Sequence, residues 1–566
     1  MPKPYIERIP EKVRLVILTV IYAVVGGLIT VAFMVGINRL YLAIWPKLAA
    51  CHPLTFLGGS FLALSVSSLL VGILMSKVSP GAAGSGIPQL KSAYWINFGH
   101  IPFRAILVKF IGGIISLGGG SSLGREGPTV FITGGLAANI ASWLGIGRQQ
   151  RRQAAATGAA AGLAAAFNTP LAAISFVLEE ILSDLGNRVI GGVTMAAVVG
   201  AFIVHALIGR QPSFYMPSVD AVSWNVYTVV PLVALLAGLL GVAFQRLTLH
   251  LRQRMRDQRR IPLWLRPLCG ALAVWVIGCS VFFMTGRLGV FGLGYEDLSD
   301  ALQHGIGWKL ALLLAVAKLA ATIISYGSGG CGGIFSPTLF IGAMGGFFVA
   351  GLTNIWLPLA PADHFVLAAV GMSACFGAVV RAPVTSILMI FEMTHQFGMV
   401  PALMLGTLIS QIVGRLAGRQ NFYEAILTQD GHELRKIIPP RNLADWRAMP
   451  LSVFASRQPT AITDLSPEQL RAVLKSHPYR RFPVIIDGKV EGIATRENLK
   501  KCLEYGGAPE LSPPLIFNAR QTLQEVEPAF GQSNTGLFLV AEKEGGPVSG
   551  VFTLYDILRI QTAMLE

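Results

Sequence analysis

Charged side chains are scarce in this chain of 566 residues: 13% are Asp, Glu, Lys or Arg, and 53% of all residues are hydrophobic. Soluble domains carry about 25% charged residues, so the composition excludes a soluble globular protein of this size. Roughly a dozen apolar segments follow one another from Leu15 to about Ala417. Many are rich in Gly or shorter than the ~20 residues of a simple span, which is typical of transporters whose helices end inside the membrane. We therefore predict an α-helical polytopic membrane protein.

Acidic residues are fewer than basic ones, 30 against 45, which gives a net charge of +15. The basic residues cluster in the short segments 148–152 and 252–260, which we interpret as cytoplasmic linkers rather than as a nucleic-acid surface. The basic start of the chain predicts a cytoplasmic N-terminus, followed by a first apolar run that is retained in the membrane. Six cysteines without pairing or metal-ligand spacing predict neither a disulfide framework nor a metal site. The chain also lacks a His-Glu-x-x-His motif and paired catalytic aspartates, so we expect no enzyme.

One of the few acids, Glu126, lies in the segment Gly-Arg-Glu-Gly-Pro at residues 124–128. A carboxylate within a membrane segment is expensive and predicts a functional site. Flanking glycines let the backbone approach a small ligand, and Pro128 suits a first helical position. The segment therefore predicts a helix N-terminus, which attracts anions. The alternative is a loop glutamate at the membrane surface.

Two sequence matches indicate an internal repeat. Residues 128–132 (PTVFI) recur at 337–341 (PTLFI), an offset of 209, and residues 168–174 align with 381–387 at an offset of 213. Two pairs in the same order are hard to ascribe to chance. In repeats of this kind the transport site lies near the midplane, where discontinuous helices of the two copies meet. The residues alone leave open whether the copies are parallel or inverted.

The repeat also sorts the acidic residues. Glu179 has an acidic counterpart, Glu392, at the offset of 213, whereas Glu126 and Glu180 have apolar counterparts. A structural carboxylate is expected in both copies, but a mechanistic one is needed in only one. Glu126 and Glu180 are therefore the candidates for a mechanistic role. For Glu180 the alternative is a helix end wetted by the cytosol.

Three Gly-bearing loops, at 84–88, 124–128 and 332–337, present backbone amides before or at a proline. Such loops can hold a dehydrated anion without a buried cation. Together with the 159–170 run, the 381–383 turn and Tyr423, they resemble the CLC family of chloride channels and chloride/proton exchangers, from residue ~15 to ~427. The resemblance implies the CLC inverted repeat with discontinuous helices.

The resemblance also implies roles for individual residues. The outer gating glutamate would be Glu126, and the inner proton-transfer glutamate Glu180. The central chloride site would be lined by two hydroxyls and two backbone N–H groups: those of Ser85 and Tyr423, and of Ile334 and Phe335. The alternatives are an ordinary turn serine and an interfacial-belt tyrosine. Near the first loop, Gln89 replaces a glutamate common in the family, and we interpret Lys91 as a solvated helix residue rather than an attractor of anions.

An ionised Glu126 can occupy the amide cluster that chloride would occupy, and protonation frees that cluster. Protonation of Glu126 should therefore depend on chloride occupancy, which couples the two ions. We expect chloride/proton antiport without a required cofactor; the alternative is a voltage- or proton-gated chloride channel. Amide-rich loops disfavour a divalent-cation transporter. The family implies a homodimer with one pathway per subunit, and the compact loops suggest the inner (plasma) membrane of a bacterium.

The composition turns polar after about Leu427. We expect a transmembrane domain at 1–430 (repeats ~15–208 and ~226–427), a linker at 431–445 and two cytoplasmic α/β units at 446–504 and 505–566. Each unit contains a predicted strand pair, 482–494 around Asp-Gly and 537–552 around Gly-Gly, which together resemble a CBS-domain pair. In the second unit Thr553 and Asp556 are candidates for binding an adenine nucleotide, or alternatively helix-capping residues.

Overall fold

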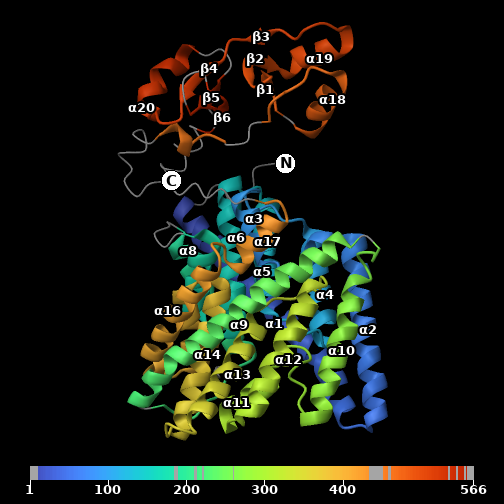
Figure 1. Cartoon of the computed structure of the whole chain (residues 1–566), viewed down its shortest axis with the longest axis vertical. Helices are drawn as coiled ribbons and strands as arrows, with labels where there is room; N and C mark the ends of the chain where they lie inside the picture. The colour runs from blue at the N-terminus through green and yellow to red at the C-terminus, as the bar shows by residue number, and fades with distance from the viewer. Residues whose placement is uncertain are drawn as a thin grey trace. The chain divides into compact units, whose positions relative to one another are not determined.

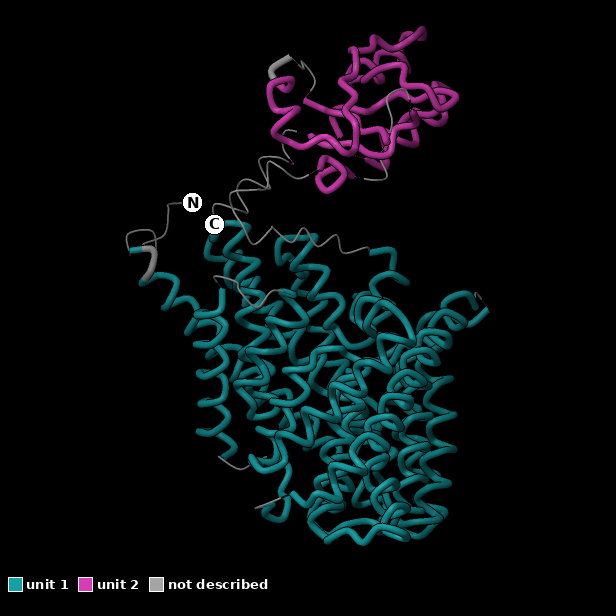
Figure 2. The backbone as a smooth tube through the Cα atoms, turned by 60° about the vertical axis from the view of Figure 1, so that its left-hand side comes forward, with its two compact units in different colours: residues 1–434 teal, residues 435–566 magenta. Residues whose placement is uncertain are grey.

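The computed structural model describes residues 10–183, 189–209, 213–219, 222–258, 260–432, 450–456, 460–477, 479–532, 536–542, 546–553 and 556. The chain divides into two compact units, residues 1–434 and 435–566 (Figure 2). The first unit is helical, and the second combines short helices with two small sheets.

Nine helical segments among the described residues are long and apolar enough to cross a membrane, and all of them lie in the first unit. The α-helices of this unit are α1 (Glu11–Ala49), α2 (Pro53–Val78), α3 (Ile87–Trp95), α4 (Phe103–Gly118), α5 (Glu126–Trp143), α6 (Arg148–Phe167), α7 (Pro170–Phe176), α8 (Ile190–Leu207), α9 (Trp224–Asp257), α10 (Arg266–Thr285), α11 (Tyr295–His304), α12 (Trp308–Gly327), α13 (Phe335–Thr353), α14 (Pro361–Val380), α15 (Pro383–Thr394), α16 (Val400–Ala417) and α17 (Phe422–Gln429). Figure 1 shows α3 and α17 at one end of the unit and α11 at the opposite end. Short turns of helix complete the unit: η2 (Pro80–Ala82), the π-helical η3 (Val177–Leu182) and η4 (Phe397–Met399).

The predicted repeat is confirmed by matching breaks in the backbone. Helices α5 and α13 begin at equivalent residues, Glu126 and Phe335. Helices α6 and α14 are followed directly by Asn168 and Arg381, which both adopt a left-handed conformation, with φ of 59° and 61°. A proline then starts α7 and α15. The order of the elements thus pairs α1–α8 with α9–α16.

The relation between the copies is a twofold rotation. Gly124 and Gly333, which are equivalent at the offset of 209, form an antiparallel bridge in which each N–H donates to the other's carbonyl, at 2.7 and 2.6 Å. Reciprocal bonds between equivalent residues are what a twofold axis between the two copies produces. The equivalent helices α3 and α11 lie at opposite ends of the unit, so the two copies are inverted with respect to one another, as the family resemblance implied (Figure 1).

Two predictions about the helices were wrong in detail. The basic segments 148–152 and 252–257 are not linkers: the first begins α6 and the second ends α9. Arginines near the C-terminus of α9 are stabilised by the helix dipole. Pro128 is the third residue of α5 rather than the first, since the helix already begins at Glu126.

In the second unit the helices and strands are η6 (Leu451–Val453), α18 (Pro467–Ser476), β1 (Arg481–Ile486), β2 (Lys489–Thr495), α19 (Arg496–Tyr505), β3 (Leu511–Ser512), β4 (Leu515–Asn518), α20 (Leu523–Val526), η7 (Glu527–Gln532), β5 (Leu537–Ala541) and β6 (Val548–Thr553). The sheets have the orders β1-β2-β3 and β4-β5-β6. Both predicted strand pairs are antiparallel ladders, β1 with β2 and β5 with β6. Asp487 and Gly488 form the first turn with positive φ, as a two-residue hairpin requires. Part of the second turn, including Gly545, lies outside the described residues.

Candidate functional site

Loops of the two repeats meet at the centre of the first unit. Besides the Gly124–Gly333 bridge, the amide of Gly84 donates to the carbonyl of Gly330 at 2.9 Å, and that of Gly332 donates to the carbonyl of Gly84 at 3.2 Å. Helices α3, α5 and α13 begin directly after these loops. The first amides of a helix have no acceptor within it, so several unsatisfied donors converge here.

Glycine is required where the loops touch. A Cβ atom on Gly127 would lie 2.2 Å from the Ser85 hydroxyl oxygen, and one on Gly333 would lie 2.9 Å from the backbone nitrogen of Gly127. Gly86 adopts φ of 94° ahead of α3, a conformation that L side chains rarely adopt. The close approach therefore brings Ser85, the start of α5 and the loop before α13 into contact.

Glu126 is fully buried at the first position of α5. Its Oε1 atom accepts hydrogen bonds from the hydroxyls of Tyr295, at 2.7 Å, and Ser336, at 2.6 Å, and lies 3.8 Å from Nε of Arg125. The Oε2 atom has no hydrogen-bond partner among the described residues. Burial rules out the alternative of a loop glutamate at the membrane surface.

Ser85 and Tyr423 are also fully buried, and neither hydroxyl oxygen has a hydrogen-bond partner in the part of the chain that the structure describes. Buried hydroxyls without partners are costly, and together they suit an anion that accepts from both. Burial of Tyr423 does not fit an interfacial-belt tyrosine, while the ordinary turn serine stays open as the alternative for Ser85.

The loop between Gly332 and α13 supplies the candidate amide donors. Ile334 precedes α13 and Phe335 is its first residue, and both are fully buried. The Phe335 ring packs against those of Phe167, Phe176 and Phe376, with centroid distances of 6.1, 5.3 and 4.5 Å. This aromatic packing fixes the start of the helix and so the direction of its free N–H groups.

Glu180 is 3% exposed and forms a buried cluster on the side of α3 and α17. Its Oε1 accepts from Nζ of Lys91 at 2.6 Å, and its Oε2 from the side-chain amide of Asn421 at 2.8 Å. The interpretation of Lys91 as a solvated residue was wrong, because Lys91 is fully buried and also lies 3.6 Å from Glu424. The alternative of a wetted helix end for Glu180 is likewise wrong.

Asn421 links this cluster to the candidate chloride site. Its Oδ1 atom accepts from the backbone amide of Glu424 at 2.8 Å, so it caps α17, the helix that carries Tyr423. One side chain thus joins Glu180 to the helix of a candidate chloride ligand. Sequence reasoning missed this role, since only the fold brings Asn421 and Glu180 together, 241 residues apart.

Sequence analysis missed two buried lysines, although they occupy equivalent positions in the two repeats. Lys109 and Lys318 are equivalent at the offset of 209, and both are fully buried. Lys109 donates to the carbonyl of Gly84 at 2.7 Å, and Lys318 to those of Gly289 and Gly292 at 2.9 and 2.8 Å. Each lysine thus stabilises the glycine loop that leads into α3 or α11.

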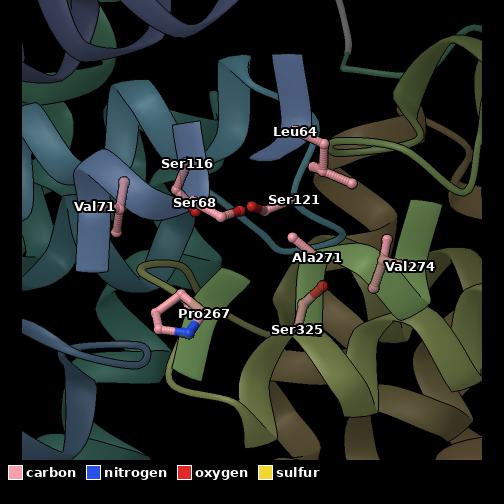
Figure 3. A pocket seen from close by; sticks show the side chains of 10 residues that line it. Leu64, Ser68, Val71, Ser116, Ser121, Pro267, Ala271, Val274 and Ser325 are labelled. Atoms are coloured by element: carbon pink, nitrogen blue, oxygen red, sulfur yellow. The ribbon is translucent and has the colours of Figure 1, made fainter. Parts of the chain in front are cut away.

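The described part of the first unit contains a larger and a smaller cavity of interest. One, of about 330 Å³, lies between α1 and α11 and is lined in part by Asn38, Tyr41, Arg125, Tyr295 and Asp297. The other, of about 10 Å³, is surrounded by the side chains of Ser68, Ser116, Ser121 and Ser325 (Figure 3). The small one has room for a single water. It belongs to the packing of α2, α4, α10 and α12, while the larger adjoins the residues around Glu126.

The second unit shows how the candidate nucleotide residues are engaged. The Thr553 hydroxyl donates to Oδ2 of Asp556 at 2.8 Å and accepts from the amide of Asp556 at 3.2 Å. The backbone amide of Thr553 also donates to Asp556, at 3.0 Å. This reciprocal bonding is that of a helix cap. In the first half, Thr495 caps α19 through the amide of Asn498.

An inverted helical repeat whose broken helices meet around buried donors and a buried carboxylate defines a membrane ion-transport protein. The chain belongs to the voltage-gated chloride channel family, whose model matches residues 67–415. It is 32% identical over 388 residues to the H(+)/Cl(-) exchange transporter ClcA of Vibrio cholerae serotype O1, a match that covers 65% of this chain and 81% of the relative. The family is one of multi-pass membrane transport proteins rather than enzymes.

Solved structures agree with this assignment. A slow cyanobacterial Cl−/H+ antiporter is 25% identical, with a TM-score of 0.65, and the match covers 75% of this chain and 98% of that one. A eukaryotic CLC transporter is 21% identical with the same TM-score of 0.65, and the match covers 96% of this chain and 98% of that one. The second likeness shows the fold, with a match that extends beyond the helical unit.

Proposed function

We propose that this protein exchanges chloride for protons across a membrane and that Glu126 couples the two ions. The observation that carries the proposal is the buried Glu126 carboxylate at the N-terminus of α5, beside the loops of both repeats. A carboxylate and a chloride ion compete for donors of this kind. Protonation removes the charge of Glu126 and so frees the donors for chloride. The naming of the Vibrio cholerae relative supports exchange.

The chloride ion would be held by donors from both repeats. Ser85 and Tyr423 would contribute their hydroxyls, and Ile334 and Phe335 their backbone N–H groups. The hydroxyl oxygens of Ser85 and Tyr423 are buried and have no hydrogen-bond partner among the described residues, which supports this assignment. No buried cation needs to bind the ion, because unsatisfied amides at helix starts supply the positive potential.

Glu180 would pass protons between the cytoplasmic side and Glu126. Its burial and its hydrogen bond from Asn421, which caps the helix that carries Tyr423, support this role. Lys91 and Asn421 each donate to one oxygen of Glu180, and each oxygen keeps a second lone pair that can take a proton. Glu180 would therefore take up and release its proton without breaking either bond.

Three further features complete the proposal. The protein would act as a homodimer with one pathway per subunit, in a bacterial inner membrane, with its N-terminus and the second unit in the cytoplasm. The second unit would be a CBS-domain pair, since it contains two similar strand pairs. The Thr553 hydroxyl donates a hydrogen bond to Asp556. Both side chains would have to give up this bond to contact an adenine nucleotide with the same atoms.

The test is transport by the purified protein in liposomes with an outward chloride gradient, while external pH is recorded. Exchange predicts that chloride efflux drives protons into the vesicles against a proton gradient. Chloride efflux without proton movement would contradict the proposal. The protein would then be a gated chloride channel, the alternative function of this family.

A further inference from the structure

Two hydroxyl groups donate hydrogen bonds to Glu126 and have no role in the exchange mechanism proposed above. Tyr295 and Ser336 both donate to its Oε1 atom, and the Ser336 hydroxyl lies 3.0 Å from that of Tyr295. All three side chains therefore form one hydrogen-bonded group. Tyr295 begins α11 and Ser336 is the second residue of α13, so both come from the second repeat, whereas Glu126 belongs to the first.

The repeat gives Tyr295 a place on the pathway. At the offset of 209, Tyr295 corresponds to Gly86, the residue just before α3, and Lys318 supports its loop as Lys109 supports the loop of Ser85. Helices α3 and α11 lie at opposite ends of the unit (Figure 1). Since α3 lies on the same side as α17 and Glu180, α11 approaches Glu126 from the side opposite to the inner glutamate.

The larger cavity lies on this same side. Tyr295 both lines the cavity of about 330 Å³ and reaches Glu126, and Arg125, the residue before Glu126, lines it as well. The wall also contains Asn38, which is exposed, and the acidic residues Glu296 and Asp297. A polar cavity of this volume has room and partners for several water molecules. Water in the cavity is therefore separated from Glu126 by little more than Tyr295.

We propose that the Tyr295 hydroxyl relays protons between water in this cavity and Oε1 of Glu126. In the inward direction the hydroxyl proton passes to Glu126 while the phenolic oxygen takes a proton from a cavity water. Tyr295 ends as it began, and one proton has moved. The outward direction reverses both transfers. Ser336 holds the carboxylate in place by its own bond to Oε1. The inference rests on the exchange activity proposed above.

The surroundings of Tyr295 favour a relay over an ionising acid. Burial and the neighbouring Glu126 carboxylate raise the pKa of the Tyr295 hydroxyl well above its usual range. The hydroxyl therefore keeps a proton and can give it up only as it gains another. The charged groups around the cavity are Arg125 and the acids Glu296 and Asp297, of which Asp297 lies 3.4 Å from Arg287. The Tyr295 ring is fixed by Phe214, edge-on at 5.3 Å, and by Arg125 at 5.2 Å.

The test compares three variants in the liposome assay. Tyr295→Phe removes the relay but keeps the ring contacts and the bond from Ser336 to Glu126. Ser336→Ala removes a donor but keeps the relay. Tyr41→Phe is the matched control, because Tyr41 lines the same cavity and makes no hydrogen bond to Glu126 among the described residues. Coupled proton and chloride exchange should fall about tenfold or more in Tyr295→Phe, fall less in Ser336→Ala and stay unchanged in Tyr41→Phe.

A second background separates proton transfer from damage to the chloride path. In Glu126→Gln, chloride flux no longer needs protons, so adding Tyr295→Phe should leave that flux unchanged. Equal losses in Tyr295→Phe and Ser336→Ala, full exchange in Tyr295→Phe, or a lower chloride flux in the double variant would each overturn the relay. These outcomes leave the exchange proposal intact. A wild-type protein that moves no protons would overturn both the Tyr295 relay and the proposed chloride/proton exchange.

Discussion

At the scale of single residues, both glutamates of the pathway accept hydrogen bonds from other buried groups. The Glu180 cluster makes this plain, since a cation and an amide satisfy both carboxylate oxygens in a site of 3% exposure. A buried charge pair tolerates the loss of one partner poorly, because the other charge stays buried. The role of Lys91 can therefore be tested through stability, independently of transport.

Replacing Lys91 with Met should lower the free energy of unfolding by about 3 kcal/mol, because the Glu180 carboxylate loses its cation. Thermal unfolding in detergent measures the effect as a lower midpoint. The double variant Lys91→Met/Glu180→Gln removes both charges and should regain most of the loss. If Lys91→Met alone unfolds like the wild type, the ion pair contributes nothing and Lys91 has another role.

Gly127 offers a second test at this scale. A methyl group at this position would meet the Ser85 hydroxyl oxygen at 2.2 Å, so Gly127→Ala must displace Ser85. Chloride flux should fall about tenfold, the effect of losing one good hydrogen bond to an anion. Gly191→Ala is the control, because Gly191 lies within α8 and the added methyl would meet no described atom within 4 Å outside the backbone of its own helix. Normal chloride flux in Gly127→Ala would exclude Ser85 from the chloride site.

At the scale of helices, each repeat caps a helix of the other. Glu179 accepts from the amides of Val384 and Thr385, at 3.2 and 2.9 Å, at the start of α15. Its counterpart Glu392 accepts from the amides of Leu171 and Ala172, at 2.9 and 2.7 Å, at the start of α7. Glu179 and Glu392, which the repeat predicted to be structural, thus each cap a helix of the other copy.

These caps should stabilise the fold without contributing to ion coupling. Glu392→Ala should cost about 1–2 kcal/mol, as the loss of a helix cap does. Glu179→Ala should cost more, because Glu179 also accepts from the Thr385 hydroxyl at 2.7 Å. Unfolding midpoints give the order of the two effects, and the liposome assay should show an unchanged ratio of protons to chloride. A changed ratio in either variant would contradict a purely structural role.

The sequence predicted what local patterns encode and missed what only the fold brings together. Glycines beside an acid predicted the helix start at Glu126, and the repeat separated Glu179 from Glu126. The bond from Tyr295 to Glu126 spans 169 residues, and no local pattern marks it. Lys91 was misread for the same reason, because a lone lysine on a short helix looks solvated until its partner is known. Lys109 and Lys318 could have been found, since the repeat offset of 209 relates them.

At the scale of the whole molecule, the proposed ion pathway is confined to one of the two compact units. Every residue proposed for ion transport lies between 85 and 423, within the helical unit that ends at residue 434. The inverted repeat places donors from both copies around one centre, and an acid from only one copy competes with the anion there. Because only the first copy supplies this acid, Glu126 is the residue that links chloride to protons.

The most direct test of this claim is Glu126→Gln in liposomes, with chloride efflux and external pH recorded in the same sample as for the wild type. Gln is neutral and of similar shape, so it mimics the protonated acid while carrying no exchangeable charge. We expect that chloride still crosses the membrane while chloride-driven proton movement disappears. Proton movement that stays coupled to chloride in this variant would contradict it and remove Glu126 from the mechanism.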